Sequence, residues 1–358
     1  MRWAGVARFG GGALADDPGR RRRRVAVGGY VSTAVLSSAI GAAVAPWQAG
    51  VFRAAAWTAR GLRVPARNAL LADVVPAQVY GRAYGFERAM DDLGAIAGPL
   101  LAIGLLAVVS IRTAMYLSVI PGLLAAAAIV YAIRRTATPK RRERQPVRVT
   151  VRPLLAGPLG RLLAGVAAFE TGNCASTLLI LRATDLFAAG HGRTAAAQLA
   201  VLLYVGYNTA AALVSVPAGR HADRHSPVRV LAGGAVLFAA GYTWFAVGPA
   251  QPVLLLPAFV LAGLGIGCGE TAQSAAVASL APGRLRGSAF GLLATVQAGG
   301  NLIASAVAGL LWSTVSPPAA FVFLAAAMVI AAALITTARP GSPRRAGDTR
   351  RKARPFPG

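Results

Sequence analysis

Long uncharged blocks alternate with short charged stretches along the whole chain. Each block is about 18 residues or longer, enough for a helix to cross a hydrocarbon layer of about 30 Å. Because lipid offers no partner to backbone groups, such blocks are predicted to be helices. Those nearly free of charge are Val25–Trp47, Leu93–Ile111, Thr113–Ile133, Ala195–Ala218, Val228–Gly248, Pro252–Gly269, Ser288–Thr314 and Pro317–Ala338.

Two further segments have helical character but carry charged residues. Trp47–Pro76 holds several arginines, and Gly157–Arg182 holds one glutamate. The loops alternate in charge only if both segments also cross the membrane, so ten membrane helices are expected. A helical bundle in water is the alternative, but it would need polar faces that the uncharged blocks lack.

The charge of the chain lies in particular loops. Of the 358 residues 56% are hydrophobic and only 14% are charged, with a net charge of +25, whereas soluble domains carry about 25% charged residues. Basic residues fill 20–24, 134–152 and 339–354, while the loops near Ala45 and Pro249 have none. This alternation predicts a multi-pass plasma-membrane protein with both termini in the cytoplasm and the lipid bilayer as its partner, and it argues against nucleic-acid binding.

Two motifs occur twice at nearly the same separation. "GALADDPGRR" and "GRHADRHSP" align Gly12 and Asp16 with Gly219 and Asp223, 207 residues later. "VPAQVYGRAYGF" and "APGRLRGSAFGL" align at an offset of 206. Two independent motifs at one offset indicate a duplicated bundle, and parallel repeats joined by a basic central loop are the layout of one large transporter class.

With these motifs the chain resembles a permease of the major facilitator superfamily. The doubled motif resembles that family's cytoplasmic loop signature, which joins helices 2 and 3, and 8 and 9. Arg53 stands where the family's fourth helix carries an arginine, and "GAIAGP" resembles the fifth-helix signature of proton-driven exporters. The resemblance thus marks two sets of residues: Gly12, Asp16, Arg20, Gly219, Asp223 and Arg224 for the loops, and Gly94, Gly98 and Pro99 for the fifth helix.

The resemblance also predicts how the chain is divided. The second half has 62 residues before its loop signature and the first half has 11, so the chain resembles helices 3 to 12 of a twelve-helix permease. A misplaced start, a decayed gene and a genuine ten-helix protein all fit, and missing N-terminal helices or a partner would have to cover the first bundle. The expected parts are a cytoplasmic loop-signature segment (1–24), a four-helix bundle (25–133), a basic linker (134–156), a six-helix bundle (157–338) and a basic disordered tail (339–358).

Several ionisable residues are predicted near the middle of the membrane. Glu170, Glu270 and Arg60 lie ten or more residues from the ends of their helices, and the resemblance implies that these helices line the central cavity. A buried carboxyl beside an arginine can bind or release its proton as the conformation changes. A structural hydrogen-bonding role is the alternative. The candidates for proton coupling or substrate contact are Glu270, Glu170, Arg60, Arg53, Asn173, Tyr204 and Asn208.

A second set of charges is expected to be structural. The helices that carry Arg63 and Arg67, and Asp91 and Asp92, are antiparallel and joined near Gln78. The arginines and aspartates therefore reach similar depth. Because an unpaired charge at that depth is costly, at least one Asp–Arg pair is predicted.

Other chemistries lack the residues they need. The two cysteines lie inside apolar blocks, and His221 and His225 have no third ligand nearby, so no metal site or other cofactor is expected. No phosphate-binding lysine loop and no nucleophile–base arrangement occur, which argues against an ATP-driven pump or an enzyme. The expected function is secondary transport of a small organic solute, through proton-coupled efflux (an antiporter) by alternating access. A truncated, transport-inactive fragment and an importer of the same fold remain alternatives.

Overall fold

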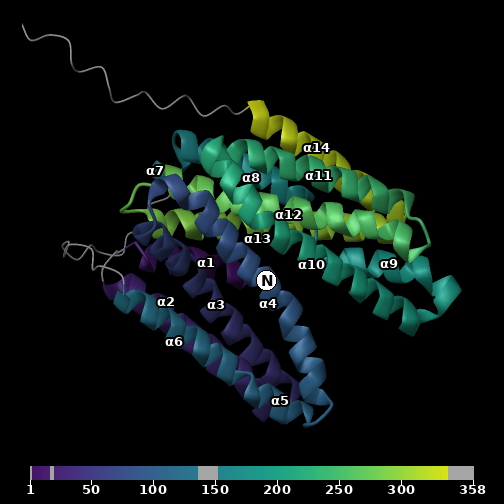
Figure 1. Cartoon of the computed structure of the whole chain (residues 1–358), viewed down its shortest axis with the longest axis horizontal. Helices are drawn as coiled ribbons and strands as arrows, with labels where there is room; N and C mark the ends of the chain where they lie inside the picture. Colours follow the sequence, from purple (N-terminus) through teal and green to yellow (C-terminus); the bar gives the residue numbers. More distant parts are fainter. Residues whose placement is uncertain (1, 17–19, 136–151, 338–358) are drawn as a thin grey trace, which may run out of the picture.

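The computed structural model describes residues 2–16, 20–135 and 152–337, and every regular element in these ranges is a helix (Figure 1). The first half contains α1 (Arg2–Leu14), α2 (Arg20–Ala39), η1 (Ile40–Ala42), α3 (Pro46–Val74), η2 (Ala77–Val79), α4 (Tyr80–Leu106), α5 (Ile111–Leu117) and α6 (Val119–Arg135). The second half contains α7 (Arg152–Leu155), α8 (Pro158–Gly172), α9 (Ser176–His191), α10 (Arg193–Arg224), α11 (Pro227–Val247), α12 (Pro252–Leu280), α13 (Arg286–Thr314) and α14 (Pro317–Thr337).

The helices have the length and composition of membrane spans. Within the described residues, nine helical segments are long and apolar enough to cross a bilayer, with α5–α6 and α8–α9 each forming one segment. Helix α3 has 29 residues but carries several arginines, so composition alone does not select it. With α3 the described residues contain the ten expected spans, four in the first half and six in the second.

Local sequence signals mark where helices begin and turn. Proline stands in the first turn of α3, α8, α11 and α12, where its missing N–H costs no hydrogen bond. Ser226 caps α11 by accepting a hydrogen bond from the Val228 amide at 3.2 Å. Gly192 and Gly248 adopt positive φ angles of 73° and 63° at the turns after α9 and α11, a conformation that glycine adopts without strain.

The two halves lie together at one end of the molecule and diverge toward the other (Figure 1). They meet mainly where α4 packs on α10 and α1 packs on α13, with smaller contacts of α4 with α12 and of α3 with α13. We call the end that holds Asp16 and Asp223 the closed end. Helices α5 and α9 lie toward the opposite end, where the two groups of ribbons are furthest apart (Figure 1).

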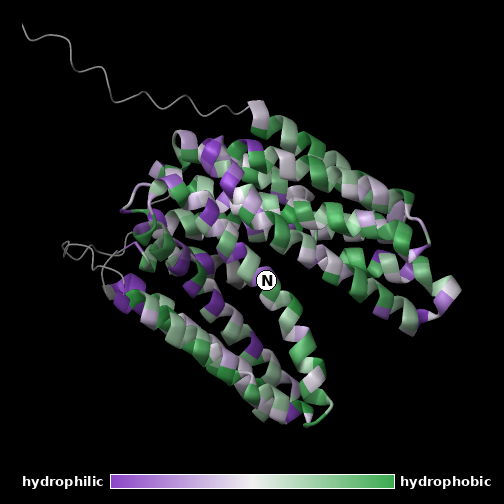
Figure 2. Cartoon of the chain, viewed as in Figure 1, coloured by the Kyte–Doolittle hydropathy of each residue, from purple (hydrophilic) through white to green (hydrophobic). Residues whose placement is uncertain are grey.

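Hydrophobic residues predominate along many of the helices (Figure 2). Leu100, Leu101 and Ile103 of α4 are each more than half exposed, which suits a helix surface in contact with lipid. The extended core lies largely in the second half, where Phe245 and Phe321 stack at 5.1 Å. A small separate cluster in the first half consists of Ala15, just after α1, Ala26 of α2 and Ala66 of α3.

Most described residues of the charged signatures lie on helices, which corrects the expectation of loops there, whereas Asp16 lies in the turn after α1. Gly12 is inside α1, and both Gly219 and Asp223 are inside α10, which ends at Arg224. The expected loop segment 1–24 therefore contains α1 and the start of α2. Most of the expected linker and the tail beyond Thr337 lie outside the described residues.

Small residues let α10 and α12 approach closely, and this generates a stability prediction. A methyl group at Gly263 would collide with the backbone oxygen of Tyr207 on α10. We expect Gly263→Ala to lower the free energy of unfolding by about 1–3 kcal/mol, because a packed interface resists added volume. Gly233 of α11 has no atom within 4 Å of the same position, so Gly233→Ala is the matched control. Equal melting temperatures of the two variants in detergent would contradict this packing.

Candidate functional site

Asp16 of the first half binds the start of α13 in the second half. Its carboxylate accepts a hydrogen bond from the Ser288 amide at 2.7 Å and another from the Ser288 hydroxyl. A negative charge is stabilised at a helix N-terminus by the unpaired amides and the helix dipole. Burial raises the pKa of Asp16 above its ordinary value, and the Ser288 hydrogen bonds and the Arg22 charge act in the opposite direction.

A second aspartate makes the mirror-image contact. Asp223, near the end of α10, accepts hydrogen bonds from the amides of Gly81 and Arg82 at the start of α4, at 2.5 and 3.1 Å. The Arg82 guanidinium adds an ion pair at 3.2 Å. The two contacts are related by the same offsets as the sequence repeat. Each half thus contributes one aspartate that binds the other half, and the two contacts together hold the closed end.

Glycines at both contacts allow the helix backbones to approach. A methyl group at Gly12 would collide with the backbone of Gly287 and Gly291 on α13. The equivalent group at Gly219 would collide with the backbone of Gly81 on α4. The glycines of the repeated motifs are therefore explained by close packing between the halves.

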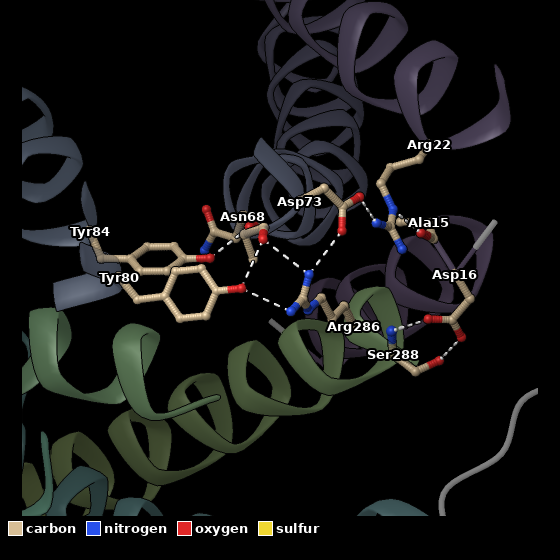
Figure 3. Close-up of polar contacts among 10 residues, drawn as sticks. Ala15, Asp16, Arg22, Asn68, Asp73, Tyr80, Tyr84, Arg286 and Ser288 are labelled. Atoms are coloured by element: carbon tan, nitrogen blue, oxygen red, sulfur yellow. Dashed lines mark hydrogen bonds and ion pairs between the residues drawn. The ribbon is translucent and has the colours of Figure 1, made fainter. Parts of the chain in front are cut away.

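An ion-pair network lies beside the contact between Asp16 and Ser288 (Figure 3). Asp73, near the end of α3, pairs with the fully buried Arg22 of α2 and, at 3.0 Å, with Arg286 of α13. Arg286 also donates to the Tyr80 hydroxyl at 2.8 Å. One carboxylate is thus shared by arginines from the two halves. The side chain of Arg20, the arginine that the resemblance marks, lies outside the described residues.

A further ion pair joins the halves deeper in the molecule. Arg88 of α4 contacts the carboxylate of Glu270 on α12 and the carboxylate of Asp92, one turn further along α4, at 3.0 Å. Arg88 lies seven residues beyond Gly81, about 10 Å deeper along the helix. The Arg88 and Glu270 side chains are about a quarter exposed, whereas Asp92 is buried.

The predicted Asp–Arg pair between α3 and α4 is present. Arg67 of α3 pairs with Asp91 of α4 at 3.5 Å and also with Glu87. Arg63 instead lies over the ring of Tyr30 on α2, 4.0 Å from its centre. Asp92 pairs with Arg88 because Arg63 faces α2, away from α4.

Sequence reasoning missed Glu87 and Arg88 of this group. Both stand in "GFERAMDD", directly before the apolar block that was taken to begin at Leu93. The structure starts α4 at Tyr80, so this charged stretch is part of the helix. The signal was available, because positive and negative residues three and four apart favour a helical face with internal pairs.

Glu170 lies in a polar network inside the second half. Its two carboxylate oxygens accept hydrogen bonds from the side-chain amides of Gln273 and Asn173, both at 2.9 Å. Gln297 donates to Gln273 at 2.7 Å. Next to this network the chain is non-helical at 173–175, where Asn301 of α13 donates to the Asn173 carbonyl at 2.7 Å. The hydrogen bond from Asn301 satisfies a backbone carbonyl at the break between α8 and α9.

The remaining predicted residues are placed as follows. Asn208 donates to the carbonyl of Tyr204 one turn earlier in α10 at 2.9 Å, and the Tyr204 hydroxyl accepts from Ser176 at 3.2 Å. Both therefore make contacts within the second half. Arg53 and Arg60 of α3 are exposed, and no carboxylate among the described residues lies within ion-pair distance of either. Gly94 and Gly98, which precede Pro99 in α4, have open space beside them.

Comparison with known proteins identifies the family. The model of the Major Facilitator Superfamily matches residues 4–191 and, a second time, residues 162–357. The chain belongs to the major facilitator superfamily. Membership supports a secondary transporter that is embedded in a bilayer and moves a small solute. The two overlapping matches also agree with the sequence repeat, because together they span both halves.

Relatives and solved structures agree with this family assignment. The uncharacterized MFS-type transporter MJ1317 of Methanocaldococcus jannaschii is 26% identical over 310 residues, which cover 86% of this chain and 76% of that protein. The uncharacterized protein Mb2288 of Mycobacterium bovis is 29% identical, with 79% and 68% covered.

Two solved structures share the fold at low sequence identity. The human organic anion transporter MFSD10 superposes with a TM-score of 0.72 at 13% identity, covering 93% of this chain and 82% of that one. The proton:xylose symporter XylE superposes with a TM-score of 0.69 at 14% identity, covering 93% and 84%. At these identities the likeness shows the superfamily fold alone.

The crossed aspartate contacts predict a crossed response in hydrogen exchange. We expect Asp16→Ala to speed amide exchange at Ser288, and Asp223→Ala to speed it at Gly81 and Arg82. The expected change is about tenfold, because an unsatisfied amide costs about 1–3 kcal/mol.

The matched control is Asp185→Ala, because Asp185 is an exposed aspartate of α9. We expect this variant to leave amide exchange unchanged in the peptides that contain Ser288 and Gly81, when exchange is followed by mass spectrometry. A change confined to the half that carries the substitution would contradict the crossed arrangement.

Proposed function

We propose that this superfamily member couples the efflux of a small organic solute to proton entry, and that Glu270 carries the proton. The observation that supports this role is the ion pair between Glu270 of α12 and Arg88 of α4. It connects the two halves, which must move relative to each other in alternating access. A charge-dependent bond at this position links protonation to conformation.

The proton acts by cancelling an attraction in a region of low dielectric constant. While Glu270 is ionised, its carboxylate attracts the Arg88 guanidinium and favours contact between α4 and α12. When a proton binds the Glu270 carboxylate, that attraction is lost, and Arg88 keeps Asp92 as its partner within α4. The halves are then held by the closed-end contacts and by the hydrogen bond from Arg8 of α1 to the Ala294 carbonyl of α13. Release of the proton on the other side restores the pair.

Glu170 suits this role less well than Glu270. Both oxygens of Glu170 are already hydrogen-bonded to amides of the same half, and its side chain is buried. Its protonation would therefore change no contact between the halves. We assign Glu170, with Asn173, to holding the break between α8 and α9. The pairs of Arg67 are assigned a structural role for the same reason, because Glu87 and Asp91 belong to the first half.

Charge supports the proposed orientation of the chain, and the α4 signature supports the proposed direction of transport. The closed end carries the basic end of α6, with Arg134 and Arg135, and the start of α7 at Arg152 (Figure 1). By the positive-inside rule, this charge supports a cytoplasmic position for the closed end. Efflux is supported by the likeness of Gly94, Gly98 and Pro99 to the exporter signature. An importer would use the same ion pair in the reverse direction.

Proton-linked opening can be measured without knowing the solute. Spin labels at Ala77 and Arg284, exposed positions at the closed end of the two halves, would report its width by pulsed electron resonance. The buried Cys174 and Cys268 would first be replaced by alanine. We expect longer distances at acidic than at alkaline pH, because protonation of Glu270 removes its attraction to Arg88. Glu270→Gln should give the long distances at either pH.

Glu170→Gln is the matched control for this experiment. It removes the same charge from a neighbouring helix, and we expect it to retain the pH response. A wild-type distance distribution that is independent of pH would exclude proton-linked opening. A pH response that survives in Glu270→Gln would move the coupling proton to another group.

Direction can be tested by comparing what cells retain and release. Cells producing the wild-type chain should lose at least one organic solute to the medium relative to cells producing Glu270→Gln, measured by untargeted mass spectrometry. A solute enriched inside the wild-type cells would instead indicate import. Identical profiles at equal protein levels would contradict transport that depends on Glu270.

A further inference from the structure

We infer that the transported solute is an organic anion whose acidic group binds the arginines of α3 and whose apolar part packs on Trp57. This inference rests on the proposed transport function, because it places the solute between the two halves. The feature that carries it is a column of three arginines, Arg53, Arg60 and Arg67, spaced seven residues apart along α3.

Helix α3 borders the second half through contacts with α13 and α12, and the column follows one of its faces. Seven residues are nearly two helical turns, so the three side chains lie on one face of α3, about 10 Å apart. Arg67, the last of the three, pairs with Glu87 and Asp91 of α4. The face that carries Arg53 and Arg60 is therefore the one turned toward α4, and Figure 2 shows hydrophilic patches recurring along α3.

The neighbouring carboxylates are already occupied. Glu87 and Asp91 pair with Arg67, and Asp92 and Glu270 pair with Arg88. Among the described residues, this leaves the guanidinium groups of Arg53 and Arg60 without an acidic partner. Both side chains are also exposed rather than covered by protein. The exposed face of α3 therefore carries an excess of positive charge.

Arg60 lies where an unpaired charge is most costly. It is the middle residue of the 29-residue helix α3, about 21 Å from either end. A charged side chain at this depth faces a water-filled cavity or a partner rather than lipid. Its charge is therefore available to a solute that enters from water.

Arg8 of α1 adds a further positive group near Arg60. Its side chain experiences the like charge of Arg60 and the opposite charge of Glu270. It also donates a hydrogen bond to the Ala294 carbonyl on α13 at 3.1 Å. Arg8 thus reaches from the first half to the second, and it brings the positive region close to the proposed proton carrier.

The apolar part of the solute is indicated by Trp57. This side chain is about half exposed and stands four residues after Arg53 and three before Arg60, so all three share a face of α3. An indole between two guanidinium groups offers a flat apolar surface and charge-assisted hydrogen bonds together. This combination suits an aryl or alkyl carboxylate better than a sugar or an organic cation.

Binding to the purified full chain tests this inference with three probes that differ mainly in charge. These are 2-naphthoate, 2-naphthamide and (2-naphthyl)methylammonium, measured by titration calorimetry at constant ionic strength. We expect 2-naphthoate to bind and the other two to bind at least tenfold more weakly. Arg60→Gln and Arg53→Gln should each weaken 2-naphthoate binding about tenfold or more, because each removes a charge-assisted hydrogen bond.

Arg161→Gln is the matched control, because Arg161 is an exposed arginine of α8 in the second half; it should bind as wild type. Arg60→Lys keeps the charge and should bind more tightly than Arg60→Gln, and wild-type melting temperatures would show that the variants fold. Binding of the amide or the ammonium probe as tightly as the carboxylate would overturn the inference. So would carboxylate binding that is unaffected by both glutamine variants.

The same preparations separate this inference from the proposed function. If 2-naphthoate fails to bind while the closed end still opens through Glu270 on acidification, the anion class is wrong and proton-linked transport stands. If 2-naphthoate binds through Arg60 but the closed end does not respond to pH, the solute class stands and the role of Glu270 is wrong.

Discussion

The pairing of charges inside apolar helices is the constraint on which the rest of the structure depends. An isolated charge in the membrane interior is costly, and α3, α4 and α12 carry several. Most are neutralised by close partners, and the pair between Arg88 and Glu270 does so across the two halves. Neutralising these charges therefore also fixes how the halves meet. In the proposal, a proton that binds Glu270 changes both the charge balance and the contact between the halves.

The closed end applies the same principle with backbone groups. Asp16 and Asp223 each bind amides at the start of a helix in the opposite half, and glycines bring the backbones near enough for this. Because both contacts lie at the closed end, losing them would separate α13 from the first half and α4 from the second half at that end. Two sets of polar contacts at different depths thus hold the halves, and in the proposal only the deeper one responds to protonation of Glu270.

Much of the fold was predictable, because hydropathy reports membrane helices directly and the duplicated motifs report the two halves. The sequence could not show that each repeated motif contacts the other half, since a repeat gives equivalence and no partners. Glu170 and Glu270 were also alike in the sequence, both being acidic and deep. Their difference comes from neighbours on other helices. Arg88 was missed because its charged stretch was placed before the membrane helix that contains it.

A double-mutant cycle between Arg88 and Glu270 tests the central claim most directly. The free energy that separates the closed and opened forms of the closed end would be measured for wild type, Arg88→Gln, Glu270→Gln and the double variant at pH 8. The account predicts that the two substitutions are strongly non-additive, with a coupling energy of about 1 kcal/mol or more, and that this coupling disappears at acidic pH. Additive effects at pH 8 would contradict the claim that this ion pair holds the halves together.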